Sequence, residues 1–194
     1  MARDRDEEDA GGERKTLVAP VAVAEGLDRI ADEIVARGPS DEVFLVGIRR
    51  GGEPVAQHLA RALGRRTGRM VKLGSVDITL YRDDAATALP SPRIGPSHLP
   101  FDIAGRRVVL VDDVLFTGRT IRAALDALLD FGRPRRIELC VIADRGGREL
   151  PIQPDYAVAT VAVDEGRRVE VHTLADGDGF EVVSAISHAM RSET

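Results

Sequence analysis

One stretch of the sequence combines residue types that suit the two ends of a sugar phosphate. The apolar run 108–111 leads into two carboxylates, Asp112 and Asp113, and Thr117-Gly118-Arg119-Thr120 follows shortly after. A glycine turn that opens a helix presents backbone N–H groups and the positive end of the helix dipole to an anion, here a phosphate monoester. The carboxylates repel phosphate but accept hydrogen bonds from the vicinal hydroxyls of a ribose. The pattern therefore predicts a site for a ribose 5-phosphate.

Other phosphate-binding and metal-binding patterns fit this chain poorly. The Walker loop requires Gly-Lys before Ser or Thr, and the sequence contains no Gly-Lys pair. The dinucleotide fingerprint G-x-G-x-x-G is absent from the expected strand-to-helix turns. The four histidines are scattered and Cys140 lies within an apolar run, so we expect neither a metal held by the protein nor a cysteine nucleophile.

Composition narrows the class of protein. The 194 residues are 43% apolar, which suits one sizeable core, and the net charge of −5 argues against a general nucleic-acid coat or a membrane-surface protein. Of the 27 cationic residues, all except Lys15 and Lys72 are arginine, the residue that binds phosphate and carboxylate in a bidentate manner. No stretch approaches the ~20 apolar residues of a membrane span. We therefore expect a soluble, cytoplasmic protein.

Hydrophobic periodicity predicts alternating helices and strands. Helices are expected from residue 21 to Gly38, from Gly52 to Gly64 and over 119–131. Strands are expected at 43–48, 76–81, 107–111, 137–143, 156–163, 169–174 and 180–183, the last two joined as a hairpin. This order predicts an α/β fold: a Rossmann-like, mostly parallel twisted sheet flanked by helices, with a small C-terminal antiparallel hairpin. In such sheets ligands bind at the carboxyl ends of the strands, where 49–52 and 112–120 both fall.

Two segments break this periodicity. Residues 1–16 are rich in mixed charges, so we expect a disordered leader before a single domain at 17–194. Residues 82–102 contain Pro90, Pro92, Pro96 and Pro100 among small polar residues. Because a structureless stretch of roughly this length inside a compact domain is usually functional, we predict a mobile lid there.

The string Val111-Asp-Asp-Val-Leu-Phe-Thr-Gly-Arg-Thr120 resembles the signature of the type I phosphoribosyltransferases, which use 5-phosphoribosyl 1-pyrophosphate (PRPP). Residues 76–84, Gly132-Arg-Pro134 and Asp144-Arg-Gly-Gly-Arg-Glu-Leu-Pro-Ile152 are similar to one family among them, the pyrimidine-operon regulators that also act as uracil phosphoribosyltransferases (PyrR). The resemblance runs from about Leu17 to about Asp155. It implies synthesis of UMP and pyrophosphate from uracil and PRPP, and UMP-responsive attenuation of pyrimidine biosynthesis genes through binding to pyr leader mRNA.

The resemblance also implies a role for each candidate site residue. Asp112 and Asp113 would hold the ribose hydroxyls and, together with Arg82 at the head of the lid, carry the catalysis. PRPP would be bound by Val114, Leu115, Phe116, Thr117, Gly118, Arg119 and Thr120, and its pyrophosphate by Ile48, Arg49, Arg50 and Gly51. Mg²⁺ would be carried mainly by PRPP, with no metal-binding residues in the chain. The family implies a homodimer or a larger homo-oligomer and no membrane partner.

The chain departs from the family's pattern in three places, one of which is Asp28, where the family often has a polar, uncharged residue and where a carboxylate would repel RNA phosphate. Gly147 stands where the family usually has histidine, and residues 157–168 replace the usual sequence near the base site. Asp144, Arg145 and Arg148 fall in this base and RNA region. Two interpretations are open for the arginines at 133, 135, 136, 145 and 148: one basic face that binds RNA, or solvated loop charges. Two alternatives therefore stay open: a phosphoribosyltransferase for a different base, and an RNA-binding regulator with little catalysis.

Overall fold

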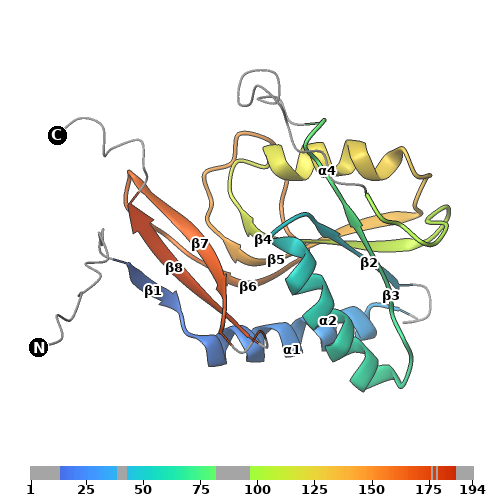
Figure 1. The fold of residues 1–194 in the computed structure, drawn as a ribbon, viewed down its shortest axis with the longest axis horizontal. Helices are drawn as coiled ribbons and strands as arrows, with labels where there is room; N and C mark the ends of the chain where they lie inside the picture. The colour runs from blue at the N-terminus through green and yellow to red at the C-terminus, as the bar shows by residue number, and fades with distance from the viewer. Residues whose placement is uncertain (1–13, 39–42, 82–96, 176, 178, 187–194) are drawn as a thin grey trace, which may run out of the picture.

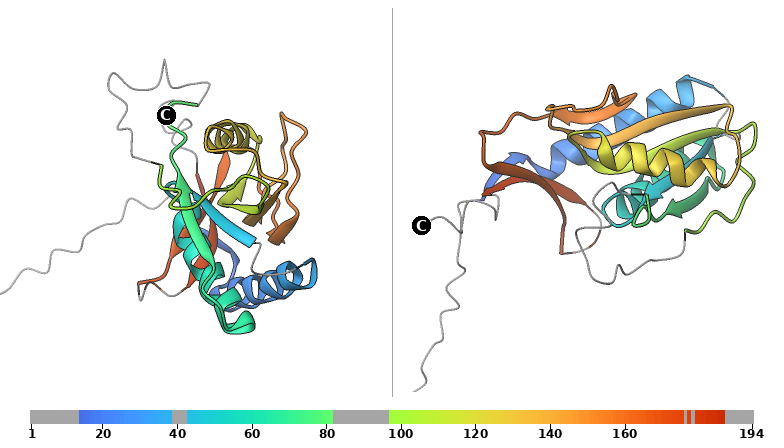
Figure 2. Two further views of the ribbon diagram at one scale, coloured as in Figure 1. Left: turned by 90° about the vertical axis from the view of Figure 1, so that its right-hand side faces the viewer. Right: turned by 90° about the horizontal axis from the view of Figure 1, so that it is seen from above.

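A parallel five-stranded sheet forms the centre of the computed structural model, which describes residues 14–38, 43–81, 97–175, 177 and 179–186 (Figure 1). Its order is β3-β2-β4-β5-β6, and every neighbouring pair is parallel. The strands are β2 (Val43–Ile48), β3 (Lys72–Val76), β4 (Arg107–Leu115), β5 (Arg136–Asp144) and β6 (Tyr156–Thr160). Helices α1 (Pro20–Ala36) and α2 (Gly52–Thr67) cover one face, and α4 (Arg119–Leu129) covers the other (Figure 2). The expected fold class is confirmed.

A second, antiparallel sheet lies beside the carboxyl-end side of the first. It consists of β1 (Lys15–Val18), β8 (Phe180–Ile186) and β7 (Arg167–Thr173), in the order β1-β8-β7, and is called here the small sheet. The expected C-terminal hairpin is thus present, with a third strand added from the N-terminal side. Val169, Phe180 and Val182 join the core that α1 and α2 cover, so the small sheet is packed onto the main one.

The core divides into two layers because strand side chains alternate between the faces of the sheet. Leu45 and Val109 pack beneath α1 and α2, whereas Val46 and Val108 pack beneath α4. All six residues of β2 are buried. Burial on both faces explains why this strand reads as an unbroken apolar run instead of an alternating one.

A buried ion pair ties the amino end of the central sheet together. Arg107 donates to Glu138 Oε2 through Nη2 (2.8 Å) and to the Ile34 carbonyl through Nη1 (3.0 Å), and the Tyr156 hydroxyl donates to the same Glu138 oxygen (2.9 Å). Burial disfavours the charge of Glu138, but hydrogen bonds from Arg107 and Tyr156 hold its pKa below the usual value. Burial, and then the bond to Glu138, raises the pKa of Tyr156 to about 12.

Two expected boundaries on the β2-to-β3 side are wrong. The strand predicted at 76–81 lies earlier, as β3, because Asp77 ends it: the Asp77 carboxylate accepts the Thr79 N–H (2.8 Å) and forms a turn in place of a strand. The helix predicted to stop at Gly64 continues as α2 to Thr67. Gly68, with φ of +67°, is the glycine that ends it.

Other boundaries shift by a few residues. The strand expected at 107–111 continues to Leu115, since β5 pairs with β4 as far as Leu115↔Asp144. Lys15 and Thr16 pair with β8, so they belong to β1 and not to the expected leader, of which residues 1–13 lie outside the described residues. Of the expected lid, 82–96 likewise lies outside them, whereas His98 forms a bridge to Ser75 along β3. Within the described part of the chain, no helix is both long and apolar enough to cross a membrane.

We predict that Glu138→Gln lowers the free energy of unfolding by about 3 kcal/mol, because it leaves the buried Arg107 without its counter-ion. The matched control is Glu33→Gln, which removes an exposed i,i+4 partner of Arg29 and costs less than about 0.5 kcal/mol. Urea unfolding of both variants measures the difference. Equal losses would show that the Arg107 pair does not stabilise the sheet.

Candidate active site

Two carboxylates emerge from the centre of the sheet at the carboxyl end of β4. Asp112 is 4% exposed and still part of the strand, where it pairs with Val141 of β5. Its Oδ1 accepts the N–H of Asp113 (3.0 Å), and Asp113 Oδ1 accepts the N–H of Val114 (2.8 Å). Burial, and then the neighbouring charge of Asp113, raises the pKa of Asp112 well above its ordinary range.

The glycine-rich loop 49–52 lies against this acidic pair, as the sequence predicts. It follows β2, the strand next to β4, and Gly47 is in register with Val111. A methyl group added at Gly51 would collide with the Asp113 carboxylate, and one at Gly52 with the Val111 carbonyl oxygen. Glycine is needed at position 52 because the start of α2 meets the β4 backbone there, whereas a methyl group at Gly51 would push the Asp113 carboxylate aside.

The cations of this loop have defined positions. The Arg49 N–H donates to the Val76 carbonyl (3.0 Å), and its guanidinium faces Glu53 at 3.7 Å, while the Arg50 side chain is exposed. The peptide bond between Arg49 and Arg50 is cis. Ile48 is the last residue of β2 and is buried.

The predicted phosphate-binding segment 114–120 spans three elements. Val114 and Leu115 complete β4, Arg119 and Thr120 begin α4, and 116–118 form the connection between them, called here the phosphate turn. Gly118 adopts a φ of +92°, a conformation that favours glycine, and its carbonyl accepts the Arg122 N–H (2.9 Å) to close the first turn of α4. The turn and the acidic pair thus share one edge of the sheet.

Residues 145–150, called here the backing loop, pack behind the phosphate turn. The Arg145 guanidinium stacks on the Phe116 ring at 3.8 Å from its centroid and donates to the Arg167 carbonyl of the small sheet (2.8 Å). Arg148 donates to Asp144 Oδ1 (2.7 Å) and to the Phe116 carbonyl (2.9 Å). Of the three residues that the resemblance places in a base and RNA region, Arg145 and Arg148 therefore contact the phosphate turn, and Asp144 accepts a hydrogen bond from Arg148.

Gly147 allows this packing. It has a φ of +70°, and a methyl group there would lie 2.5 Å from Phe116 Cε2. Gly146 has nearly the same φ, +72°, but no atom lies within 4 Å of the position that its methyl group would occupy. The Phe116 ring occupies the space that a side chain at position 147 would need.

The interpretation that five arginines form one basic face is wrong. Arg133, Arg135 and Arg136 lie at the amino end of β5, and Arg145 and Arg148 follow its carboxyl end. A strand of nine residues separates the groups by about 25 Å at ~3.3 Å per residue. Sequence proximity placed them together, but a strand carries its two ends to opposite edges of the sheet.

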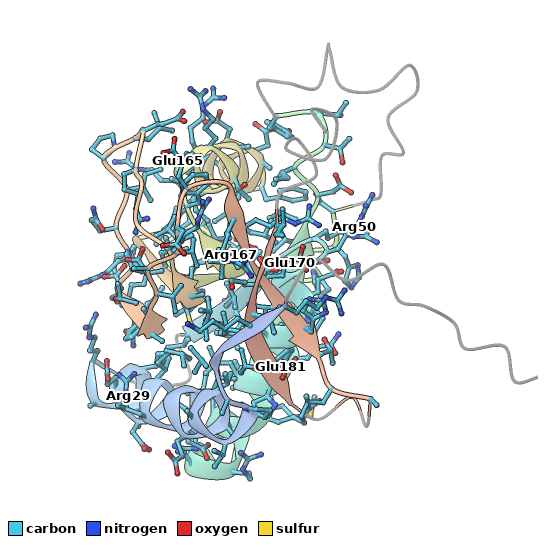
Figure 3. All side chains as sticks on the ribbon, turned by 90° about the vertical axis from the view of Figure 1, so that its left-hand side faces the viewer. Arg29, Arg50, Glu165, Arg167, Glu170 and Glu181 are labelled. Atoms are coloured by element: carbon cyan, nitrogen blue, oxygen red, sulfur yellow. The ribbon has the colours of Figure 1, made fainter. Side chains whose placement is uncertain are left out.

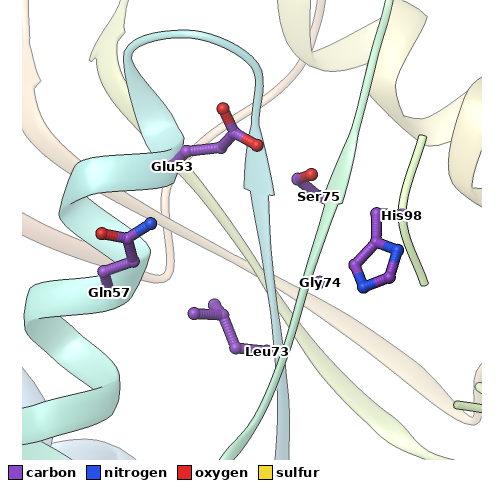
Figure 4. Close-up of a pocket in the computed structure, with 6 residues that line it drawn as sticks. All are labelled: Glu53, Gln57, Leu73, Gly74, Ser75 and His98. Atoms are coloured by element: carbon purple, nitrogen blue, oxygen red, sulfur yellow. The ribbon is translucent and has the colours of Figure 1, made fainter. Parts of the chain in front are cut away.

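Two cavities lie near the site. One, of about 170 Å³, is bounded by Glu53 and Gln57 of α2, by β3 and by His98, so it adjoins the glycine loop at the edge of the sheet (Figure 4). The other, of about 400 Å³, lies at the small sheet and is lined by Lys15, Leu17, Ala162, Val163, Asp164, Arg167 and Ser184. Figure 3 views the molecule from the side of the small sheet and labels Arg167 on β7.

Two further sequence expectations concern reactive groups. Cys140 is buried in β5, and burial raises the pKa of its thiol to about 12, which suits a core residue. Among the described residues, no three His, Cys, Asp or Glu side chains gather as metal ligands. Arg82, the third predicted catalytic residue, lies outside the described residues.

Comparison with known proteins identifies the family. Residues 14–171 match the phosphoribosyl transferase domain. The chain is 48% identical over 173 residues to the bifunctional protein PyrR of Chloroflexus aurantiacus, which covers 89% of this chain and 94% of that protein. It is 44% identical over 171 residues to the bifunctional protein PyrR of Deinococcus radiodurans, with coverages of 88% and 93%. The chain belongs to the PyrR family.

Solved structures agree with this membership at the level of the fold. The hypoxanthine phosphoribosyltransferase of Trypanosoma cruzi has a TM-score of 0.60 at 19% identity, over 88% of this chain and 97% of that one. The purine phosphoribosyltransferase of Pyrococcus horikoshii has a TM-score of 0.55 at 25% identity, over 74% and 87%. The resemblance drawn from residues 76–84, 111–120 and 144–152 is confirmed, and the domain is that of a phosphoribosyltransferase.

Sequence reasoning missed two features of the site. It did not single out Gly52, although the paired glycines 51 and 52 after a buried strand are a visible signal of close approach. It also missed that the backing loop contacts the phosphate turn, because no local pattern reports a contact between two loops that follow neighbouring strands.

We predict that Gly147→Ala destabilises the protein more than Gly146→Ala does. Each variant forces alanine into a positive φ, at a cost of about 1 kcal/mol, but only Gly147→Ala also displaces Phe116, which adds about 1 kcal/mol or more. Chemical denaturation measures both, and Phe116→Leu in the Gly147→Ala background should narrow the gap. Equal losses in the two single variants would contradict the contact.

We predict that Asp112→Asn gains stability relative to wild type as the pH rises. The raised pKa means that the folded protein keeps a proton on Asp112 which the unfolded chain has released, so wild-type stability falls from the ordinary pKa near 4 up to the raised value. Asparagine does not titrate and escapes that loss. Unfolding free energies from pH 4 to pH 7.5 test this; a pH-independent difference between the two proteins would refute it.

Proposed function

We propose that the protein transfers the phosphoribosyl group of PRPP to uracil, forming UMP and pyrophosphate. The observation that carries this proposal is the presence of three parts at one edge of the sheet. The acidic pair suits the ribose hydroxyls, the phosphate turn suits the 5-phosphate, and the glycine loop suits the pyrophosphate. PRPP is a molecule that carries those three groups in that connection.

The residues support a mechanism through charge stabilisation. As the bond between ribose C1 and pyrophosphate breaks, positive charge develops on the ribose ring. The Asp113 carboxylate stabilises that charge, while Asp112, whose burial favours its proton, contributes a hydrogen bond to the ribose. Arg49 and Arg50 neutralise the leaving pyrophosphate. Uracil N1 then attacks C1 and loses its proton, so that no covalent enzyme intermediate is required.

The roles of Mg²⁺ and of the lid are inferred from the family resemblance. The oxygen-rich pyrophosphate suits Mg²⁺, which prefers hard oxygen ligands and would neutralise the leaving group's charge. Asp113, whose carboxylate lies beside Gly51, would be a carboxylate available to a metal ion carried by PRPP. Arg82 at the head of the lid would help to close the site and exclude water, which otherwise hydrolyses PRPP.

The cavity of the small sheet is our candidate for the base. Its residues Lys15, Arg167 and Ser184 lie on the same strands as Leu17, Val169 and Val182, and they alternate onto the face of the small sheet that packs toward the core. Asp164 offers an acceptor, and Lys15 a donor, for the N3–H and a carbonyl of a pyrimidine. Arg145 links this wall to Phe116 of the phosphate turn.

One observation favours a second candidate, transfer to a different base. Ala162, Val163, Asp164 and Arg167 belong to the stretch 157–168 in which the chain departs from the family's pattern. A changed wall changes which exocyclic groups can be paired, because a site built for one hydrogen-bond pattern rejects another. A panel of uracil, cytosine, hypoxanthine and guanine at fixed PRPP separates the two candidates.

Regulation through pyr leader mRNA, and assembly as a homodimer or larger oligomer, are proposals from family membership. Asp28, which introduces a carboxylate on α1, is paired with Arg66 of α2 (3.0 Å), so its charge is locally compensated. The remaining basic cluster, Arg133, Arg135 and Arg136, lies at the edge opposite the active site. Filter binding of the leader transcript with and without UMP, over a range of salt concentrations, tests the regulatory part.

The central test is conversion of radiolabelled uracil to UMP in the presence of PRPP and Mg²⁺. We predict turnover by the wild-type protein and a loss of at least about a hundredfold in Asp112→Asn/Asp113→Asn, given what electrostatic stabilisation contributes in enzymes. Arg82→Ala should lower turnover while leaving the unfolding transition unchanged. Absence of product with every base would refute the enzyme assignment, and wild-type rates in the double variant would refute the roles of the carboxylates.

A further inference from the structure

Three consecutive carbonyl groups at the phosphate turn all bind the backing loop. The Leu115 carbonyl accepts the Arg145 N–H (2.9 Å), and the Thr117 carbonyl accepts the N–H groups of Glu149 (3.0 Å) and Leu150 (3.1 Å). Between them, the Phe116 carbonyl accepts Nη1 of Arg148 (2.9 Å). The carbonyl groups of residues 115–117 therefore all face one segment of the chain.

Peptide geometry turns this into a statement about the opposite side. In a trans peptide the carbonyl of one residue and the N–H of the next point in opposite directions. Fixing the carbonyls of 115, 116 and 117 therefore aims the N–H groups of Phe116, Thr117 and Gly118 away from the backing loop. A peptide that turned over would present a carbonyl oxygen to the phosphate and repel it.

Of the four hydrogen bonds between the backing loop and these carbonyl groups, only the one from Arg148 comes from a side chain. Its Nε donates to the Ile152 carbonyl (2.8 Å), Nη1 to Phe116 and Gly146, and Nη2 to Asp144 and Gln153. The side chain is only 13% exposed. All five donors are thus directed at this chain's own acceptors, which is the arrangement of a brace and not of a group that binds a ligand.

We propose that Arg148 is a positioning residue for the 5-phosphate. Its guanidinium holds the Phe116 peptide with the carbonyl inward, so that the Thr117 N–H faces the phosphate without rearrangement on binding. This inference rests on the proposed function, since it concerns the same nucleotide site. It assigns Arg148 to the phosphate end of that site, in place of the base and RNA region that the resemblance implies.

Lysine separates geometry from charge at this position. An ammonium keeps the positive charge but lacks the planar fork that reaches Asp144 and the Phe116 carbonyl together. If the role is geometric, R148K should lose nearly as much as R148Q. If the role is only a positive charge near an anion, R148K should resemble wild type.

Calorimetric titration with UMP and, separately, with pyrophosphate and Mg²⁺ tests the proposal. We expect UMP affinity to fall about tenfold in both R148Q and R148K, the effect of misdirecting about one hydrogen bond to a charged group. Pyrophosphate affinity should stay within about twofold, because that ligand depends on the glycine loop and not on the turn. In turnover, KM for PRPP should rise by a similar factor while kcat changes much less.

The control and the contrary outcomes are distinct. R122Q removes another arginine side chain at the start of α4, one paired with Asp126 (3.0 Å), and keeps the backbone N–H that binds the Gly118 carbonyl, so it should keep wild-type UMP affinity. Equal weakening of UMP and pyrophosphate, or wild-type UMP affinity in R148K, would overturn the proposal. Unfolding curves show which variants are folded. If R148Q does not fold, the comparison of R148K with wild type tests the proposal. If the wild-type protein bound neither ligand, the proposed function itself would fail.

Discussion

Close approach between two neighbouring strand ends is the constraint on which this site depends. β2 and β4 are adjacent and parallel at the centre of the sheet, so the segments that follow them must leave the same edge side by side. No side chain fits between Gly51 and the Asp113 carboxylate, or between Gly52 and the Val111 carbonyl. The sheet thereby fixes the distance between the groups assigned to pyrophosphate and to ribose, and neither loop has to be ordered by a ligand.

At the acidic pair, the fold buries a carboxyl group that the proposed reaction uses, and burial disfavours the charged form of that group. Asp112 is held inside a β-strand because β5 pairs with β4 beyond the apolar run, as far as Asp144. Strand pairing uses only the backbone and therefore accepts a carboxylate, but burial disfavours that carboxylate's charge. A rigid strand position keeps the Asp112 side chain at the site, whereas a flexible turn would let it move into water. The position of Asp112 within β4 both lowers the stability of the folded protein and fixes the geometry of its side chain.

What the sequence predicted and what it missed follow from the range of the interactions. Buried parallel strands and helix faces have a local hydrophobic periodicity, so β2, α1 and the alternation of helices and strands could be predicted. The edge of the sheet at which 49–52 and 112–120 lie could be predicted from that order. Boundaries failed where one polar side chain decided them, as Asp77 does after β3, or where a partner strand extended pairing, as β5 does for β4. β1 and the backing loop were missed because their partners, β8 and the phosphate turn, are far away in sequence. The single basic face was also wrong, because arginines that are close in sequence lie at opposite ends of β5.

The two halves of the proposed reaction are carried by structurally separate elements, and this separation bears on how specificity can change. The groups assigned to PRPP sit on the main sheet, where a shift in one loop would collide with the next. The candidate base cavity is walled by the small sheet and by residues 162–164, and Arg145 connects this wall to the phosphate turn through its contacts to Phe116 and Arg167. The wall contains no residue of the glycine loop or of the acidic pair. The residues of 157–168 that line the cavity belong neither to the glycine loop nor to the acidic pair, so base preference is the property that departures there alter most directly.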